Sequence, residues 1–128
     1  MDMIGKIATK NAPGAIGPYS QAVKFQNFVY TSGQIALDPQ SGEMVGDNII
    51  SQSEQVMKNI IAILDAADSN VNNIIKTTCF LADMSDFAKF NEVYSKYITS
   101  HPARSCVAVK TLPKNALVEV EVVAVTNQ

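Results

Sequence analysis

Residues 117–125 read Leu-Val-Glu-Val-Glu-Val-Val-Ala-Val. The β-branched side chains and the alternation of this stretch predict a strand. One face of that strand holds Val118, Val120 and Val122, and the other holds Glu119, Glu121, Val123 and Val125. Because both faces carry valines, the sheet that contains this strand is predicted to be covered on both sides.

The chain before this strand predicts further strands and two helices. Residues 23–25 and 28–32 predict a hairpin around Gln26-Asn27, with residues 34–37 prolonging its second strand until Asp38-Pro39. The Gly- and Pro-rich segment before them has room for one short early strand. Residues 74–81 and 104–109 predict two more strands. In the first of these, Ile75, Cys79 and Leu81 are expected on one side, and Lys76, Thr78 and Phe80 on the other.

Apolar residues at helical spacing predict a helix over residues 48–68. Asp47 is the expected N-cap, although residues 51–54 also fit a capping box, and Asn70 is the expected left-handed residue beyond its end. Ser85 is expected to cap a second helix, whose core stripe is Phe87, Phe90, Tyr94, Tyr97 and Ile98.

The predicted order is therefore β-β-α-β-α-β-β, an α+β fold in one domain over residues 1–128. Two β-α-β crossovers place both helices on one face of a single mixed sheet. The other face is then left apolar and without helices, so we expect a closed homo-oligomer to bury it.

Composition excludes several classes of function. With 10 Lys+Arg against 12 Asp+Glu the net charge is −2, which opposes a nucleic-acid partner. No apolar run approaches the roughly 20 residues that span a membrane, and residues 1–6 lack the core of a secretory signal. We therefore expect a soluble, intracellular protein with reduced cysteines and no membrane partner. The sequence has one histidine, no Cys-x-x-Cys pair and no phosphate-binding glycine motif. We therefore expect neither a metal nor a cofactor.

A few side chains remain as candidates for chemistry, each with a plain structural alternative. Glu119 shares a strand face with valines and is either a half-buried carboxylate or an exposed one at a strand end. Asn91 lies on the apolar stripe of the second helix, or at its rim. Arg104 could grip a carboxylate with its planar fork, or be a solvated surface arginine. For Cys106, His101 and Tyr19, ordinary structural roles are the alternative to a place in a site.

Several blocks of the sequence resemble the Rid (YjgF) family. Its C-terminal signature is similar to Pro102-Ala-Arg-Ser-Cys-Val107, Leu112-Pro-Lys114 and Val118-Glu-Val-Glu121. Other blocks of the family resemble Gly17-Pro-Tyr-Ser-Gln-Ala22, Thr31-Ser-Gly-Gln34 and Lys76-Thr-Thr-Cys-Phe-Leu81, in the same order. Asp68-Ser69 departs from the family pattern, which often has a glycine there.

The resemblance implies a chorismate-mutase-like fold, a homotrimer and sites in clefts between subunits. It also implies hydrolysis of reactive 2-imino and 2-enamino acids, such as 2-iminobutanoate and 2-iminopropanoate, by a cytoplasmic or mitochondrial enzyme. Carried over by position, Arg104 would bind the substrate carboxylate and Glu119 would orient the attacking water. Tyr19, Ser32, Gly33, Asn91 and Cys106 would line the substrate pocket.

Two other functions remain open from the sequence. The same cleft could serve a ligand-binding or regulatory module. Some members of the family are described as ribonucleases or translation inhibitors, a role that the acidic composition opposes.

Overall fold

The computed structural model describes residues 3–128; of the N-terminal segment considered above, Met1 and Asp2 lie outside the described residues. The strands are β1 (Gly5–Ile7), β2 (Ala22–Phe25), β3 (Phe28–Thr31), β4 (Ile74–Leu81), β5 (Ala103–Ala108) and β6 (Val118–Val125). The helices are α1 (Ile49–Ala66) and α2 (Phe87–Tyr97), with short 3-10 turns η1 (Val71–Asn73), η2 (Met84–Asp86) and η3 (Pro113–Asn115).

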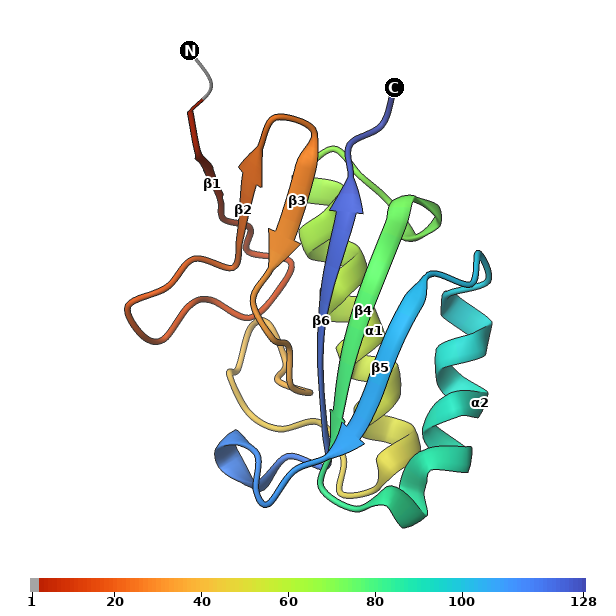
Figure 1. Ribbon diagram of the computed structural model, residues 1–128. Coiled ribbons are helices and arrows are strands. Elements are labelled where there is room, and N and C mark those ends of the chain that lie inside the picture. Colours follow the sequence, from red (N-terminus) through yellow and green to blue (C-terminus); the bar gives the residue numbers. More distant parts are fainter. Residues whose placement is uncertain (1–2) are drawn as a thin grey trace.

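All six strands form one mixed sheet in the order β1-β2-β3-β6-β4-β5. Within the described residues, β4 and β5 pair in parallel, and the other neighbouring strands pair antiparallel. The chain passes from β3 through α1 to β4, and from β4 through α2 to β5. Figure 1 views the sheet from the side without helices, and α1 lies behind the strands. The predicted α+β architecture, with both helices on one face, is confirmed, and the early short strand is β1.

The core lies between the sheet and the helices. Val118, Val120 and Val122 of β6 are at most 2% exposed, as are Ile60, Ile63 and Leu64 of α1. From α2, Phe90 and Val93 join the same cluster. The alternation of residues 118–122 therefore assigned the inner face of the central strand correctly.

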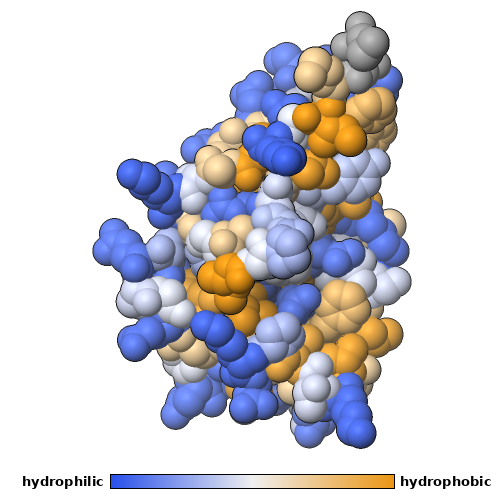
Figure 2. Space-filling view, turned by 90° about the vertical axis from the view of Figure 1, so that its left-hand side faces the viewer, coloured by the Kyte–Doolittle hydropathy of each residue, from blue (hydrophilic) through white to orange (hydrophobic). Residues whose placement is uncertain are grey.

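The opposite face of the sheet carries apolar side chains, and no layer formed by residues 3–128 covers them. It includes Phe28, Tyr30, Phe80, Val107, Val123 and Val125, of which Tyr30 and Val107 remain nearly half exposed. On the side formed by the β1 edge and its loops, apolar atoms lie in separate groups among polar ones (Figure 2). The helix-free face is thus a candidate surface for a further contact.

Three predictions about helix ends were wrong. Asn48, not Asp47, caps α1: its side chain accepts a hydrogen bond from the Ser51 backbone N–H at 2.9 Å. Beyond α1, Asp68 takes the left-handed conformation (φ 59°), while Asn70 is extended and caps η1. Ser85 does not cap α2, because the residue before that helix is Asp86. Ser85 lies inside η2, and its N–H donates to the Asp83 side chain, which caps η2. A side chain can cap a helix only at the residue where the helix begins, and the packing of the chain sets which residue that is.

Two predictions about strands were also wrong. Residues 34–37 do not prolong β3, which ends at Thr31; Gln34 instead forms an isolated bridge with Val120 of β6. Ile75 is 45% exposed because a register shift in the pairing of β4 with β6 lies between Ile74 and Lys76. Ile74 is buried in its place, as irregular pairing changes which side chains face the core.

Among residues 3–128, no helix is both long enough and apolar enough to cross a membrane.

Candidate active site

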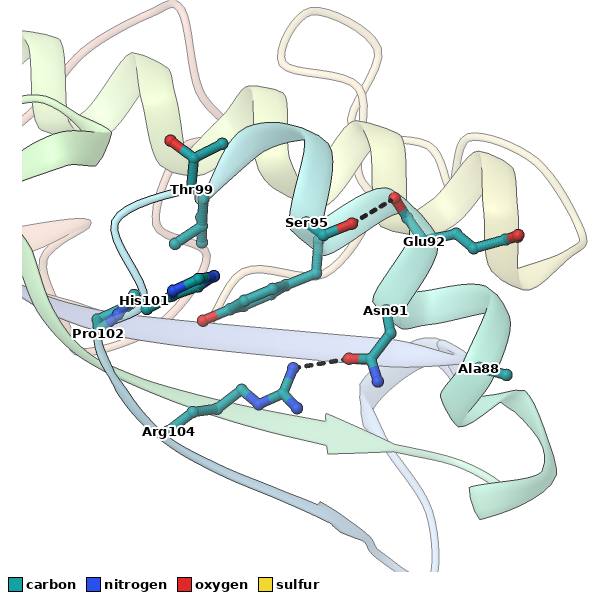
Figure 3. Close-up of a pocket in the computed structure, with 10 residues that line it drawn as sticks. Ala88, Asn91, Glu92, Ser95, Thr99, His101, Pro102 and Arg104 are labelled. Carbon is teal, nitrogen blue, oxygen red and sulfur yellow. Dashed lines mark hydrogen bonds between the residues drawn. The ribbon is translucent and has the colours of Figure 1, made fainter.

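Arg104 lies at the start of the edge strand β5, on the same side of the sheet as the helices. Its backbone pairs with Thr77 of β4. Its guanidinium donates a hydrogen bond from Nη1 to Oδ1 of Asn91 at 2.7 Å, shown as a dashed line in Figure 3. The guanidinium carbon also lies 4.9 Å from the ring centre of Tyr94 and 5.5 Å from that of Phe87. Neutral groups hold this cation, and no carboxylate among residues 3–128 forms an ion pair with it.

A groove of about 660 Å³ opens between α2 and β5 at this arginine. Its walls include Asn91, Tyr94, Ile98, His101, Pro102 and Arg104. In Figure 3 the Arg104 and Asn91 side chains point toward one another across it, and His101 and Thr99 lie at its other end. Four of the five guanidinium N–H groups are left after the bond to Asn91, which is enough for a bidentate grip on a carboxylate.

Glu119 lies on the other face of the sheet, in a smaller cavity of about 120 Å³. Its position opposite Phe80 in the β4–β6 pairing places it on the helix-free side. It is half-buried, and burial, assisted by the nearby charge of Glu121, raises the pKa of its carboxyl group. No donor or cation among residues 3–128 pairs with that carboxylate, although Lys114 lines the same cavity.

Gly33 allows the Glu119 side chain to occupy this place. A Cβ built on Gly33 would lie 2.8 Å from the carboxyl carbon of Glu119, closer than side chains tolerate. Ser32 donates from its hydroxyl to the Ser20 carbonyl at 2.6 Å, which ties the chain before Gly33 to the loop that carries Tyr19. Tyr19 is 50% exposed and lines the Glu119 cavity.

The candidate residues therefore form two separate groups within one chain. Arg104 and Asn91, with Cys106 two residues along β5, lie on the helix side of the sheet; Tyr19, Gly33 and Glu119 line the second cavity, and Glu119 faces the other side. A cation and a carboxylate thus each lack a charged partner, and the sheet separates them. Within a single chain they cannot act on the same small molecule.

Cys106 stands beside Cys79 on the neighbouring strand, and both thiols are free. Burial raises the pKa of Cys106, and it raises the pKa of Cys79 to about 12. Both groups are therefore thiols at neutral pH, a poor state for a nucleophile. Among residues 3–128 no group of three His, Cys, Asp or Glu side chains is arranged to hold a metal ion.

Sequence reasoning missed three residues of these groups. Phe87 and Tyr94 were assigned only to the core stripe, yet their rings contact the Arg104 guanidinium. Their spacing with Asn91, at i, i+4 and i+7, is the signal that places all three on one helix face. Lys114 lines the Glu119 cavity from the η3 turn, a neighbourhood that depends on how distant loops meet.

Known proteins share both the sequence and the fold of this chain. The profile of the family described as "Endoribonuclease L-PSP" matches residues 9–126. A protein of Lactococcus lactis named as a candidate regulator, AldR, is 56% identical over 92% of this chain and 94% of its own length. The mouse protein named 2-iminobutanoate/2-iminopropanoate deaminase is 48% identical over 93% of this chain and 89% of its own length. The crystal structure titled "E. coli TdcF with bound serine" has a TM-score of 0.90 at 44% identity, covering 95% of this chain and 98% of that one.

Proposed function

Because this chain belongs to the endoribonuclease L-PSP family, which contains the Rid proteins, we propose that it hydrolyses 2-imino and 2-enamino acids to 2-oxo acids and ammonia. The class of substrate includes 2-iminobutanoate and 2-iminopropanoate. Three relatives that are 47–48% identical to this chain are named for these two compounds. The observation that carries the proposal is Arg104, a cation held by an amide and two aromatic rings with its remaining donors free for a carboxylate.

The active site is composite, formed by Arg104 of one protomer and Glu119 of the partner subunit. Two charges of opposite sign that lack charged partners among residues 3–128 favour an assembly in which they meet. The apolar helix-free face supports the same assembly, because aromatic and branched side chains there gain from burial. The closed assembly is a homotrimer, and it is predicted from the family resemblance.

In this site the substrate carboxylate binds the Arg104 guanidinium through two parallel N–H···O bonds. A water oxygen bonded to the Glu119 carboxylate then attacks the electrophilic C2 of the iminium group. The C=N π electrons move to nitrogen, and the proton lost by the water passes to Glu119. Glu119 returns that proton to the nitrogen, and the C–N bond breaks with its electron pair on ammonia. The hydroxyl oxygen forms the new carbonyl and releases its proton. Proton transfer by a positioned carboxylate contributes on the order of 10²–10⁴-fold.

A coupled assay tests the activity directly. A threonine dehydratase generates 2-iminobutanoate, and the appearance of 2-oxobutanoate is followed with and without this protein. We expect the lag before 2-oxobutanoate appears to shorten in proportion to the protein added, and ammonia to be released in equal amount. An unchanged lag at every protein concentration contradicts the proposal.

A regulatory ligand-binding role is the second candidate, favoured by the name of the Lactococcus relative and by the serine in the E. coli structure title. Binding of 2-oxobutanoate or serine without any turnover would favour it. A ribonuclease function is suggested by the family description, and the net charge of −2 opposes it. The cytoplasm, with mitochondria as the alternative, stays a prediction for the compartment.

A further inference from the structure

Three residues of α2 fix the place of the Arg104 guanidinium. Phe87, Asn91 and Tyr94 follow one another at i, i+4 and i+7, so their side chains lie along one face of the helix. Asn91 holds one edge of the guanidinium through Nη1, and the two rings approach it within 5.5 Å. An attraction between a cation and a ring face depends on the position of the ring. The position of the Arg104 guanidinium therefore depends on how firmly the two rings are held in place.

Tyr94 is the ring that is held most firmly. It is 8% exposed, and its ring packs against Phe90 with ring centres 5.6 Å apart. Its hydroxyl forms a hydrogen bond with the hydroxyl of Thr77 at 2.9 Å. Burial raises the pKa of Tyr94, so the phenol stays protonated at neutral pH and keeps this bond.

Thr77 is also the residue that pairs with Arg104 in the β4–β5 ladder. It is fully buried, and its side chain bonds to Tyr94 while its backbone lies beside that of Arg104. Thr77 of β4 is thus fixed both to the backbone of Arg104 and to the Tyr94 ring that lies against the guanidinium. A shift of α2 relative to the sheet must break the Thr77–Tyr94 bond before it can move the ring.

We propose that Tyr94 and Thr77 are positioning residues that set the orientation of the Arg104 fork for a substrate carboxylate. This rests on the proposed role of Arg104 in carboxylate binding. Neither residue touches the reacting atoms; they act through the guanidinium. Their effect is therefore on affinity for carboxylate-bearing substrates and not on the bond-breaking steps.

The test compares Tyr94→Phe, Thr77→Val and the double variant. Each single change removes one hydroxyl of the same hydrogen bond, so we expect KM to rise about three- to ten-fold in each, with kcat nearly unchanged. The double variant should be no worse than the singles, because the bond can be lost only once. Tyr97→Phe is the matched control: Tyr97 is on the same helix, but its hydroxyl bonds to Glu54 of α1. It should leave KM unchanged.

A second measurement does not depend on turnover. The Nε–H signal of Arg104 in ¹⁵N NMR reports the ring current of Tyr94 and the rate of guanidinium rotation. In Tyr94→Phe and Thr77→Val we expect faster rotation and a shifted signal, and in Tyr97→Phe the wild-type signal. If the Arg104 signal is unchanged in both variants, the positioning role is wrong, whatever the activity. If the signals change but the wild-type protein has no deaminase activity, the positioning role stands and the proposed function fails.

Discussion

At the residue scale, the two charged candidates differ in what surrounds them. Arg104 is exposed and held by neutral partners, so its charge is available to an anion. Glu119 is half-buried, and no donor among residues 3–128 bonds to it, so its charged form is disfavoured. A group of each kind is what a hydrolase needs to bind a carboxylate and to exchange a proton with water.

Arg104→Lys keeps the positive charge but loses the planar fork. One of two charge-assisted hydrogen bonds is then lost, a cost of about 1.5–3 kcal/mol, so kcat/KM should fall roughly ten- to a hundred-fold, mainly through KM. Steady-state kinetics in the coupled assay measures it. Cys106→Ala, on the same strand, should change kcat/KM less than about two-fold, because partial burial raises the pKa of the Cys106 thiol and makes it a poor nucleophile. A Cys106→Ala protein that is folded but inactive would restore a nucleophilic role for the thiol.

Glu119→Gln tests the proton role with almost no change in volume. We expect kcat to fall on the order of 10²–10⁴-fold with a small change in KM. The pH profile gives a second readout. Burial raises the pKa of Glu119, so wild-type kcat/KM should decline as the pH falls through that raised pKa, because a protonated carboxyl cannot accept the proton of water. In Glu119→Gln that decline should disappear; an unchanged profile would assign the proton step to another group.

At the element scale, the start of α1 depends on one side chain. Asn48 satisfies the Ser51 N–H, which has no partner within the helix. Asn48→Ala should lower the free energy of unfolding by about 0.5–2 kcal/mol, measured by urea denaturation. Asp47→Ala, one residue earlier, should leave it within about 0.5 kcal/mol. A larger loss for Asp47→Ala than for Asn48→Ala would contradict the assigned cap.

The break after β3 places Gly33 against Glu119. Gly33→Ala should displace the carboxylate and lower kcat at least ten-fold, because the added Cβ lies too close to the Glu119 carboxyl group. The fold should survive, since the Glu119 side chain can move. Gly5→Ala in β1 is the matched control, because its new Cβ makes only ordinary contacts of 3.8 Å and longer. Equal activity of the two variants would mean that Glu119 does not act from this position.

In the whole molecule, the sheet separates the two halves of the candidate site, so the proposed activity is predicted to require assembly. Co-expression of Arg104→Lys with Glu119→Gln tests this. If one protomer supplies the arginine and its partner the glutamate, about a quarter of the interfaces in mixed assemblies regain both native residues. The mixture should then be more active than either variant alone. Activity no higher than the average of the two variants would show that the site is not shared.

The oligomeric state itself is measured by sedimentation. Val123→Lys puts a charge on the helix-free face and should dissociate the predicted trimer. Ile61→Lys makes the same kind of change on the exposed side of α1, and it should leave the mass unchanged. A wild-type protein that sediments as a monomer contradicts the assembly.

Prediction from the sequence succeeded where a pattern repeats over many residues. The bounds of β4 were predicted from its run of strand-forming residues, the inner face of β6 from alternation, and α1 from its apolar spacing. It failed where one residue decides, as at Asn48 and Ile75, because caps and register shifts depend on how neighbouring segments pack.

The layers of the protein and the residue types available for chemistry can be read from the sequence, because hydrophobic periodicity and composition are local properties. The spacing also places Asn91 on one helix face with Phe87 and Tyr94. The folded chain was needed to show that Tyr94 supports the guanidinium and that Gly33 makes room for Glu119. It alone put Arg104 and Glu119 on opposite faces of the sheet. Those relations join residues that are distant along the chain, and their distances are set by strand pairing and helix packing.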